Sequence, residues 1–208
     1  MDTWISLSIF IDEATLPFPG DEGLKIQSIK TWDKDGYHLS HVSLNMHLGT
    51  HIDHPSHVLN QQHPREINHF VGRANVIFVE PKNGLIKTQD IIDQYLFLEE
   101  KERSLIISLN HERLLNTNDY FIYPKFEKSL MSFLVEQKIT LLGSDLPSYE
   151  YMVGDMLDMH RDILNHQMTL VESMVNLTLL KSNIDLVILP IPIKGVEANI
   201  VSAIAKNH

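Results

Sequence analysis

The chain has 208 residues, with 17 Lys and Arg, 27 Asp and Glu, and a net charge of −10 at pH 7. Hydrophobic residues make up 43% of it, so this length suits one large domain with an ordinary core. The acidic balance excludes nucleic acid as the expected partner, and the absence of cysteine excludes a thiol nucleophile, a thiolate metal site and a disulfide framework.

The first half of the chain is predicted to be mostly β. Residues 5–11 form an expected strand that runs into a turn cluster rich in proline and glycine. Residues 37–47 alternate between apolar and polar side chains, which predicts a half-buried strand that ends at His47 on its polar face. Gly49 and Pro55 then interrupt regular structure, so we expect the segment after His47 to be a loop.

Strands and helices alternate in the second half, which predicts a mixed α/β fold with residues 1–208 in one domain. The expected strands are 74–80, 104–109, 139–142, 168–171 and 186–193, and the expected helical segments are 88–102, 125–137, 154–165 and 173–181. Thr88 is the expected N-cap of its helix, while Pro190 and Pro192 predict an edge position or a bend for the last strand. Residues 186–193 form the longest apolar run, which is too short to span a membrane.

Histidine is concentrated in one part of the chain. Of the 12 histidines, eight fall within residues 38–69, where a chance scatter would place about two. They are His38, His41, His47, His51, His54, His57, His63 and His69. This local density indicates a functional site.

His47, His51 and Asp53 stand at positions i, i+4 and i+6, so two imidazoles and a carboxylate can converge on one cation. This donor set suits a divalent first-row metal such as zinc, manganese, iron or cobalt, and it leaves positions open for water or substrate. A metal held in this way lowers the pKa of a bound water towards ~7. The segment therefore predicts a metal-dependent hydrolytic site.

Hydrolysis also needs a group that moves a proton near neutral pH, and His57 follows Asp53 at a suitable spacing. Gly49 is expected to permit the tight turn, and the Thr50 hydroxyl to support a metal ligand. The remaining histidines of the cluster are expected to be ordinary surface or hydrogen-bonded side chains. These are His38, His41, His54, His63 and His69.

The pattern His-x-Gly-Thr-His-x-Asp-x-Pro-x-His occupies residues 47–57 and resembles the signature of the cyclase family of metal-dependent hydrolases. That family includes kynurenine formamidases (arylformamidases) and isatin hydrolases, and every fixed position of its signature is matched. The resemblance implies a swivelling β/β/α-like domain, with a mixed sheet as its core and flanking helices. It also implies that His47, His51 and Asp53 hold one metal, that Asp53 bridges to a second, and that His57 is the proton donor and acceptor.

The same resemblance implies two distant ligands for the second metal, His160 and Glu172. His166 competes with His160 because it is nearer to Glu172, but the family spacing favours His160. Weaker matches follow in the family's order and extend the resemblance over nearly the whole chain. They lie at residues 6–8, 17–21, 143–148 and 190–194.

The chain departs from the family away from the metal ligands. Phe18 stands where kynurenine formamidases have a substrate-lining Trp, so we expect Phe18 either to pack on an aromatic substrate or to belong to the core. Ser6 and Ile9 replace an Asp and a His. The family's Gly-x-Pro-x-Arg segment is missing, and residues 198–203 stand in its place. These changes affect the pocket, so the resemblance implies the class of reaction but not the substrate.

Together these observations predict an arylformamidase-like enzyme that hydrolyses a small N-formyl or cyclic amide. We expect one or two divalent ions per chain, zinc first and manganese as the alternative, and a homodimer or homotetramer. Residues 1–4 carry no basic n-region, so we expect no signal peptide and a cytoplasmic location. The alternatives are a lactone or ester hydrolase or a cyclase of the same family, a non-catalytic metal buffer, and a degenerate regulatory homologue, which the intact ligand set disfavours.

Overall fold

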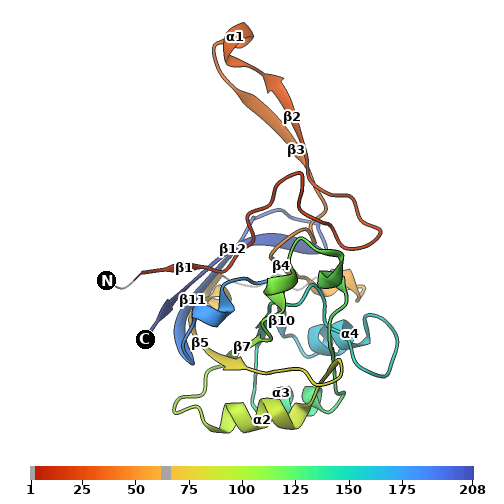
Figure 1. The fold of residues 1–208 in the computed structure, drawn as a ribbon, viewed down its shortest axis with the longest axis vertical. Coiled ribbons are helices and arrows are strands. Elements are labelled where there is room, and N and C mark those ends of the chain that lie inside the picture. Colours follow the sequence, from red (N-terminus) through yellow and green to blue (C-terminus); the bar gives the residue numbers. More distant parts are fainter. Residues whose placement is uncertain (1–2, 62–66) are drawn as a thin grey trace.

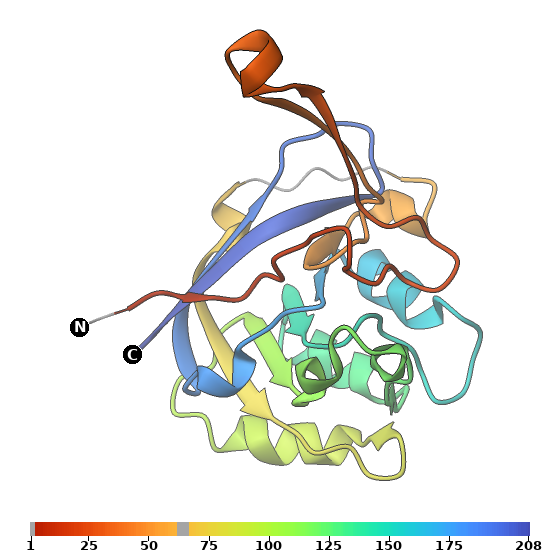
Figure 2. The ribbon, with the colours of Figure 1, turned by 45° about the horizontal axis from the view of Figure 1, so that its top comes forward.

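The computed structural model describes residues 3–61 and 67–208, and within them the main feature is a mixed sheet of eight strands. Their order is β1-β12-β11-β5-β7-β9-β10-β4, and β4 also pairs with β12. This additional pairing closes seven of the strands into a barrel and leaves β1 on its outside (Figures 1 and 2). The expected mixed sheet core is therefore present, but it is a closed barrel with few flanking helices.

The barrel combines parallel and antiparallel strands. β5, β7, β9 and β10 run parallel to one another, whereas β4, β11 and β12 are antiparallel to their neighbours. The bounds are β1 (Ile5–Ser6), β4 (His51–Asp53), β5 (Val71–Phe78), β7 (Ser104–Ser108), β9 (Leu141–Ser144), β10 (Thr169–Glu172), β11 (Asn183–Pro190) and β12 (Ala198–Asn207).

Three helices of seven or more residues and several short 3-10 turns connect the strands of the barrel. The helices are α2 (Thr88–Leu96), α3 (Leu130–Glu136) and α4 (Asp158–Asn165), and the 3-10 turns are η1 (Pro55–His57), η2 (Ile67–Phe70), η3 (His111–Leu114), η4 (Asn118–Phe121) and η5 (Leu177–Leu179). A small parallel pair, β6 (Leu85–Ile86) and β8 (Lys125–Phe126), lies apart from the barrel sheet. No helix in the described ranges is long and apolar enough to cross a membrane.

Strand alternation divides the core into two clusters. Ile106 of β7 belongs to one cluster, while its neighbours Leu105 and Ile107 belong to the other, together with the buried residues of the three helices. The cluster that includes the helices lies on the outer wall, so the cluster of Ile106 fills the barrel. Ile52 of β4 and Val171 of β10 are also part of the inner cluster.

A hairpin of β2 (Lys25–Lys30) and β3 (Leu39–Ser43) projects from the barrel, with α1 (Trp32–Asp35) at its tip (Figure 1). Every residue of β3 is exposed, and the strand ends at Ser43. The predicted half-buried strand over 37–47 is therefore wrong. Alternation distinguishes the two faces of a strand, but here β3 pairs only with β2 and neither face is covered.

The other expected strands of the barrel are present with shifted ends, but two expectations need correction. The first strand has only two residues, and residues 198–207 form β12, a strand that was not among those expected. β11 lies between β12 and β5 rather than at an edge, because Pro190 is its last residue and its missing N–H interrupts no internal pairing.

The expected helices exist but are shorter. α2 ends at Leu96, and Lys87 rather than Thr88 is its N-cap. α3 begins only at Leu130, because the residues that were expected to start it pair with β6 as strand β8. α4 begins at Asp158, after a loop, instead of at Gly154.

Candidate metal centre

The histidine motif is built on strand β4. Successive side chains of a strand point to opposite faces, so Ile52 enters the barrel while His51 and Asp53 point to the outer wall. This strand corrects the expectation of a loop after His47, which itself lies in the irregular turn before β4. Glu172 of β10 is the direct cross-strand partner of His51, so both side chains share the outer face.

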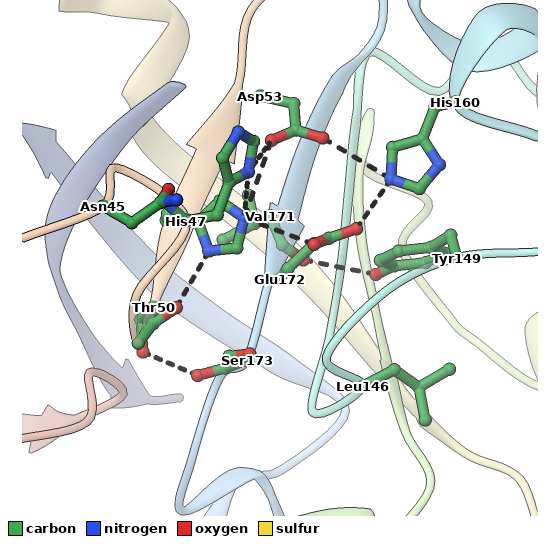
Figure 3. Close-up of polar contacts among 12 residues, drawn as sticks. Asn45, His47, Thr50, Asp53, Leu146, Tyr149, His160, Val171, Glu172 and Ser173 are labelled. Carbon is green, nitrogen blue, oxygen red and sulfur yellow. Dashed lines mark hydrogen bonds and ion pairs between the residues drawn. The ribbon is translucent and has the colours of Figure 1, made fainter. Parts of the chain in front are cut away.

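His160 reaches the same place from helix α4. It lies on the buried face of the helix with Met159, Ile163 and Leu164. Met159 and Ile163 belong to the core cluster on the outer wall. Figure 3 shows His160 approaching Asp53 and Glu172 from the side opposite His47. Residues more than a hundred positions apart in the sequence thus meet on one face of the barrel.

Three donor atoms form a compact first group. His47 Nδ1 lies 3.1 Å from His51 Nε2 and 3.3 Å from Asp53 Oδ1, and His51 Nε2 lies 3.6 Å from Asp53 Oδ1. Ligands held at 2.0–2.1 Å in a tetrahedral zinc site are separated by about 3.3–3.4 Å. The triangle therefore has the dimensions of a tetrahedral coordination face.

A second group lies on the other side of the same carboxylate. Asp53 Oδ2 is 3.5 Å from His160 Nε2, which is 3.0 Å from Glu172 Oε1. The other Glu172 oxygen is 3.2 Å from His51 Nε2. Each oxygen of Asp53 thus faces one group. His166 is exposed at the end of α4 and bonds to the Asp162 carbonyl, so His160 is the histidine at the centre.

The buried carboxylate of Asp53 provides a test of whether a metal fits. Both of its oxygens are buried, and none of their contacts with imidazoles has the geometry of a hydrogen bond. A buried ionised carboxylate without hydrogen bonds is costly unless a cation compensates it. Two imidazoles and a carboxylate are also the donors that divalent first-row metals prefer. The residues present therefore fit a divalent metal.

The charges of the centre depend on one another. Burial alone would lower the pKa of His51, but Glu172 and Asp53 outweigh it and raise that pKa to about 9. Burial would raise the pKa of Asp53, but the imidazoles of His47, His51 and His160 hold it well below its usual range. Without a metal, the site therefore holds protons at positions where a cation would bind.

His57 follows β4 on the 3-10 turn η1 and borders both groups. Its ring centroid lies 4.4 Å from that of His47 and 5.8 Å from that of His160. Partial burial lowers the pKa of its imidazole below the ordinary value, so the ring is uncharged at neutral pH. An uncharged imidazole beside the metal ligands can accept a proton and return it.

Several supporting contacts orient the ligands. His51 Nδ1 donates to the Gly49 carbonyl at 2.8 Å, which directs Nε2 at the other donors. Gly49 has φ +73°, as expected of a turn glycine. The Thr50 hydroxyl, expected to support a ligand side chain, instead donates to the Ser173 carbonyl at 2.6 Å and fastens β4 to the end of β10.

Two further residues near His47 had no signal in the sequence. Asn45 Oδ1 accepts the backbone N–H of His47 at 3.1 Å. Glu197 precedes β12, and its Oε1 lies 3.7 Å from His47 Nε2, the nitrogen that faces away from the first group. Only the closure of the barrel by β12 brings Glu197 to this position.

The other described histidines of the cluster lie outside the two groups. His54 contacts Asn199 Oδ1 at 2.6 Å, and His69 contacts Thr169 Oγ1 at 2.6 Å. His38 and His41 are exposed on the hairpin. His63 lies outside the described residues. Among the described histidines of residues 38–69, those at the centre are His47, His51 and His57.

Phe18 is half-buried and packs against the outer core cluster. Its ring meets that of Phe121 edge to face, with centroids 5.7 Å apart. At least part of the Phe18 ring therefore belongs to the core. Of the two expectations for this residue, substrate contact or core packing, the structure supports the second.

A family model described as "Putative cyclase" matches residues 5–151, which include the histidine motif. The chain belongs to the putative cyclase family. Among curated proteins, a kynurenine formamidase of Bacillus thuringiensis (strain Al Hakam) is 24% identical over 209 residues, covering 98% of this chain and 97% of the relative. The similarity therefore extends over nearly the whole length of both chains.

Solved structures share the cyclase fold. Isatin hydrolase A from Ralstonia solanacearum superposes with a TM-score of 0.84 at 15% identity, covering 99% of this chain and 92% of the other. A structure described as a predicted metal-dependent hydrolase from Bacillus stearothermophilus gives 0.83 at 16% identity and covers 100% of both chains. At this identity the likeness shows the fold, and the barrel of this chain is that of the cyclase family.

Proposed function

We propose that the protein is a metal-dependent, arylformamidase-like hydrolase that cleaves a small N-formyl or cyclic amide. The observation that carries this proposal is the pair of donor groups around Asp53, with His57 beside them. The names of the relatives, kynurenine formamidase and isatin hydrolase, support the same chemistry. The whole chain, residues 1–208, would act as one domain.

Within this proposal, each donor group would hold one ion. His47, His51 and Asp53 would hold the first, and Asp53, His160 and Glu172 would hold the second, with Asp53 shared by the two groups. Zinc is the proposed metal and manganese the alternative, because imidazole and carboxylate accept both. When bound, the metal acidifies water and polarises the substrate carbonyl.

His57 is the proposed proton donor and acceptor. It takes a proton from the water that attacks the carbonyl carbon and passes it to the leaving nitrogen as the C–N bond breaks. The products are a carboxylic acid and an amine, so the atoms and protons balance. Phe18 is the proposed contact for an aromatic substrate, through the part of its ring that the core leaves exposed.

Elemental analysis combined with a chelator-sensitive hydrolysis screen tests the proposal. We expect one or two tightly bound divalent ions per chain, and hydrolysis of N-formylkynurenine or isatin that stops with chelator and returns with metal. Lactones and simple esters in the same screen test the alternative of ester hydrolysis by the same centre. Several weakly bound ions with no hydrolysis would instead identify a metal buffer and overturn the proposal.

We also propose that the protein is a homodimer or homotetramer, held together through the β2–β3 hairpin. This arm exposes large apolar side chains, namely Ile26, Ile29, Trp32, Tyr37, Leu39 and Val42. A two-stranded hairpin is at best marginally stable in water without cover. The arm contains Lys25, Lys30 and Lys34 against only two aspartates, whereas the chain carries a net charge of −10, so a second copy offers a complementary acidic surface.

For location we propose the cytoplasm. The absence of cysteine from all 208 residues is compatible with a reducing compartment. Fractionation of cells that express the protein, with detection by antibody, would test this placement.

A further inference from the structure

A pocket of about 540 Å³ opens beside His57. It is lined by residues 56–61 on one side and by Leu157 and Arg161, at the start of α4, on the other. Its size lies within the range of about 300–1,000 Å³ that is typical of small-molecule sites. His57 therefore borders both the donor groups and this pocket.

The position of His57 fixes which part of a substrate would enter the pocket. The substrate carbonyl belongs at the metal ligands, and His57 returns its proton to the leaving nitrogen. The group attached to that nitrogen therefore extends past His57. The pocket is placed to receive the leaving amine rather than the acyl part of the amide.

Among the described residues that line the pocket, Arg161 is the only Lys or Arg, and none is Asp or Glu. Its Nη1 donates to Asp158 Oδ1 at 2.8 Å and to the Met156 carbonyl at 3.4 Å. Both contacts use one nitrogen of a guanidinium that has five N–H donors. Asp158 offsets part of the charge but holds the guanidinium in place. Within the described part of the chain Nε and Nη2 make no hydrogen bond, so both remain for a ligand.

The net negative charge of the chain makes the positive charge of Arg161 important for binding an anionic substrate. A chain with a net charge of −10 repels an anionic substrate, so such a substrate requires a local partner. A guanidinium fork matches the geometry of a carboxylate and can bind it through two parallel hydrogen bonds.

We propose that Arg161 binds an acidic group of the substrate, and that the preferred amides are those whose leaving amine carries a carboxylate. This inference rests on the proposed function and adds the substrate class. The reaction is unchanged: water cleaves the C–N bond, and the acidic amine leaves through the pocket.

The first test compares 2-formamidobenzoate, which is anionic, with formanilide, which lacks the carboxylate. We expect Arg161→Gln to lower the ratio of kcat/KM for the anionic over the neutral amide by about tenfold to a hundredfold, mainly through KM, since hydrogen bonds between charged groups have about this strength. Arg161→Lys keeps the charge without the fork and should restore part of the ratio. An unchanged ratio in Arg161→Gln would overturn the inference.

Arg73→Gln is the matched control. The Arg73 side chain is 49% exposed and that of Arg161 45%, and Arg73 also donates to a carboxylate, that of Glu100. It lies on β5, outside the residues that line the pocket. A fall of the ratio in Arg73→Gln equal to that in Arg161→Gln would mean a general charge effect and would also count against the inference.

A binding measurement separates this inference from the proposed function. Calorimetry on the metal-loaded protein should show that 2-aminobenzoate binds at least tenfold more weakly to Arg161→Gln than to the unchanged protein. If Arg161→Gln weakens this binding but the protein hydrolyses none of the amides, only the proposed function is contradicted, and the carboxylate site stands. Equal binding by the two proteins, or no binding by either, would overturn the carboxylate site whether or not amides are hydrolysed.

Discussion

The carboxylate of Asp53 is shared between two sets of imidazoles, one oxygen towards His47 and His51 and the other towards His160. The side chain is fully buried, and its pKa is held well below the ordinary range, so it remains ionised under all physiological conditions. A permanent buried anion in contact with three histidines requires compensation by protons or by a cation.

His57 is the histidine whose removal should separate chemistry from metal binding. His57→Ala should keep the metal content of the protein and lower turnover by the ~10²–10⁴ that is typical of general acid–base catalysis. Metal analysis and steady-state kinetics on the same preparation measure both effects. Loss of the metal together with activity would instead make His57 a ligand.

Gly49 should tolerate no side chain. Its φ is +73°, and a Cβ added there would lie 2.7 Å from the side chain of Ile11. Gly84 has the same φ, but a Cβ there meets nothing within 4 Å, so Gly84→Ala isolates the backbone cost of roughly 1–2 kcal/mol. Gly49→Ala should lower the free energy of unfolding by at least about 1 kcal/mol more than Gly84→Ala, as measured by urea denaturation. Equal losses would show that Ile11 moves aside freely.

At the scale of the elements, the centre depends on β4, β10 and α4. Cross-strand pairing aligns Glu172 with His51, and α4 brings His160 over both. The hairpin, in contrast, makes its strand pairing only with itself. The same chain therefore has one part that is fixed by the barrel and another that needs a surface to pack against.

Replacing the apolar pair Ile26 and Val42 with charged residues tests whether the hairpin packs against a second copy of the chain. These residues face each other across the hairpin and are 48% and 49% exposed. Ile26→Glu with Val42→Lys keeps the hairpin through an opposite-charge pair but removes its apolar surface, so we expect subunit association to weaken at least tenfold, as measured by sedimentation velocity. Phe97→Ser, at an 85% exposed site beside α2, should leave association unchanged. Unaltered association of the double variant would exclude the hairpin as the contact.

The sequence predicted the parts of the centre that lie close together along the chain. Residues 47–57 place three donors and His57 within one turn and one short strand, so their spacing alone indicates a metal site. No local pattern links His160 to Glu172, and only the family resemblance pointed to them, because their meeting depends on strand pairing and helix packing. Glu197 gave no signal at all, since the closure of the barrel by β12 was not predictable from hydrophobic periodicity.

For the whole molecule, a bound metal would fasten segments that are more than a hundred residues apart in the sequence. Ligands bind the folded state in preference to the unfolded state, so metal at a thousand times its Kd stabilises by about 4 kcal/mol. For a chain of this size that corresponds to a rise in Tm of about 10 °C. Removal of the metal by a chelator should lower the Tm by this order, as followed by calorimetry.

The decrease in Tm on metal removal should become smaller as the pH falls from 9 towards 6. Without metal, the pKa of His51 is raised to about 9, so the proton on His51 stabilises the metal-free fold most below pH 6.5 and this contribution is lost as the pH rises through 9. The same proton competes with the metal at low pH. Scans with and without chelator at several pH values measure the difference. A Tm difference between the two scans that grows as the pH falls would contradict the role given to the His51 proton.

Strand β4 is bonded on both sides, to β10 through residues 51–53 and to β12 through Ala198, Asn199 and Ile200. The strand that carries the proposed metal ligands is therefore also the strand that closes the barrel, and its second neighbour follows it more than a hundred residues later in the sequence. A nascent chain that has not yet released β12 from the ribosome has the complete histidine motif but cannot form the second edge of β4. Capture of the ion thus follows the synthesis of β12, and a polypeptide that stops before β12 is left without a finished centre.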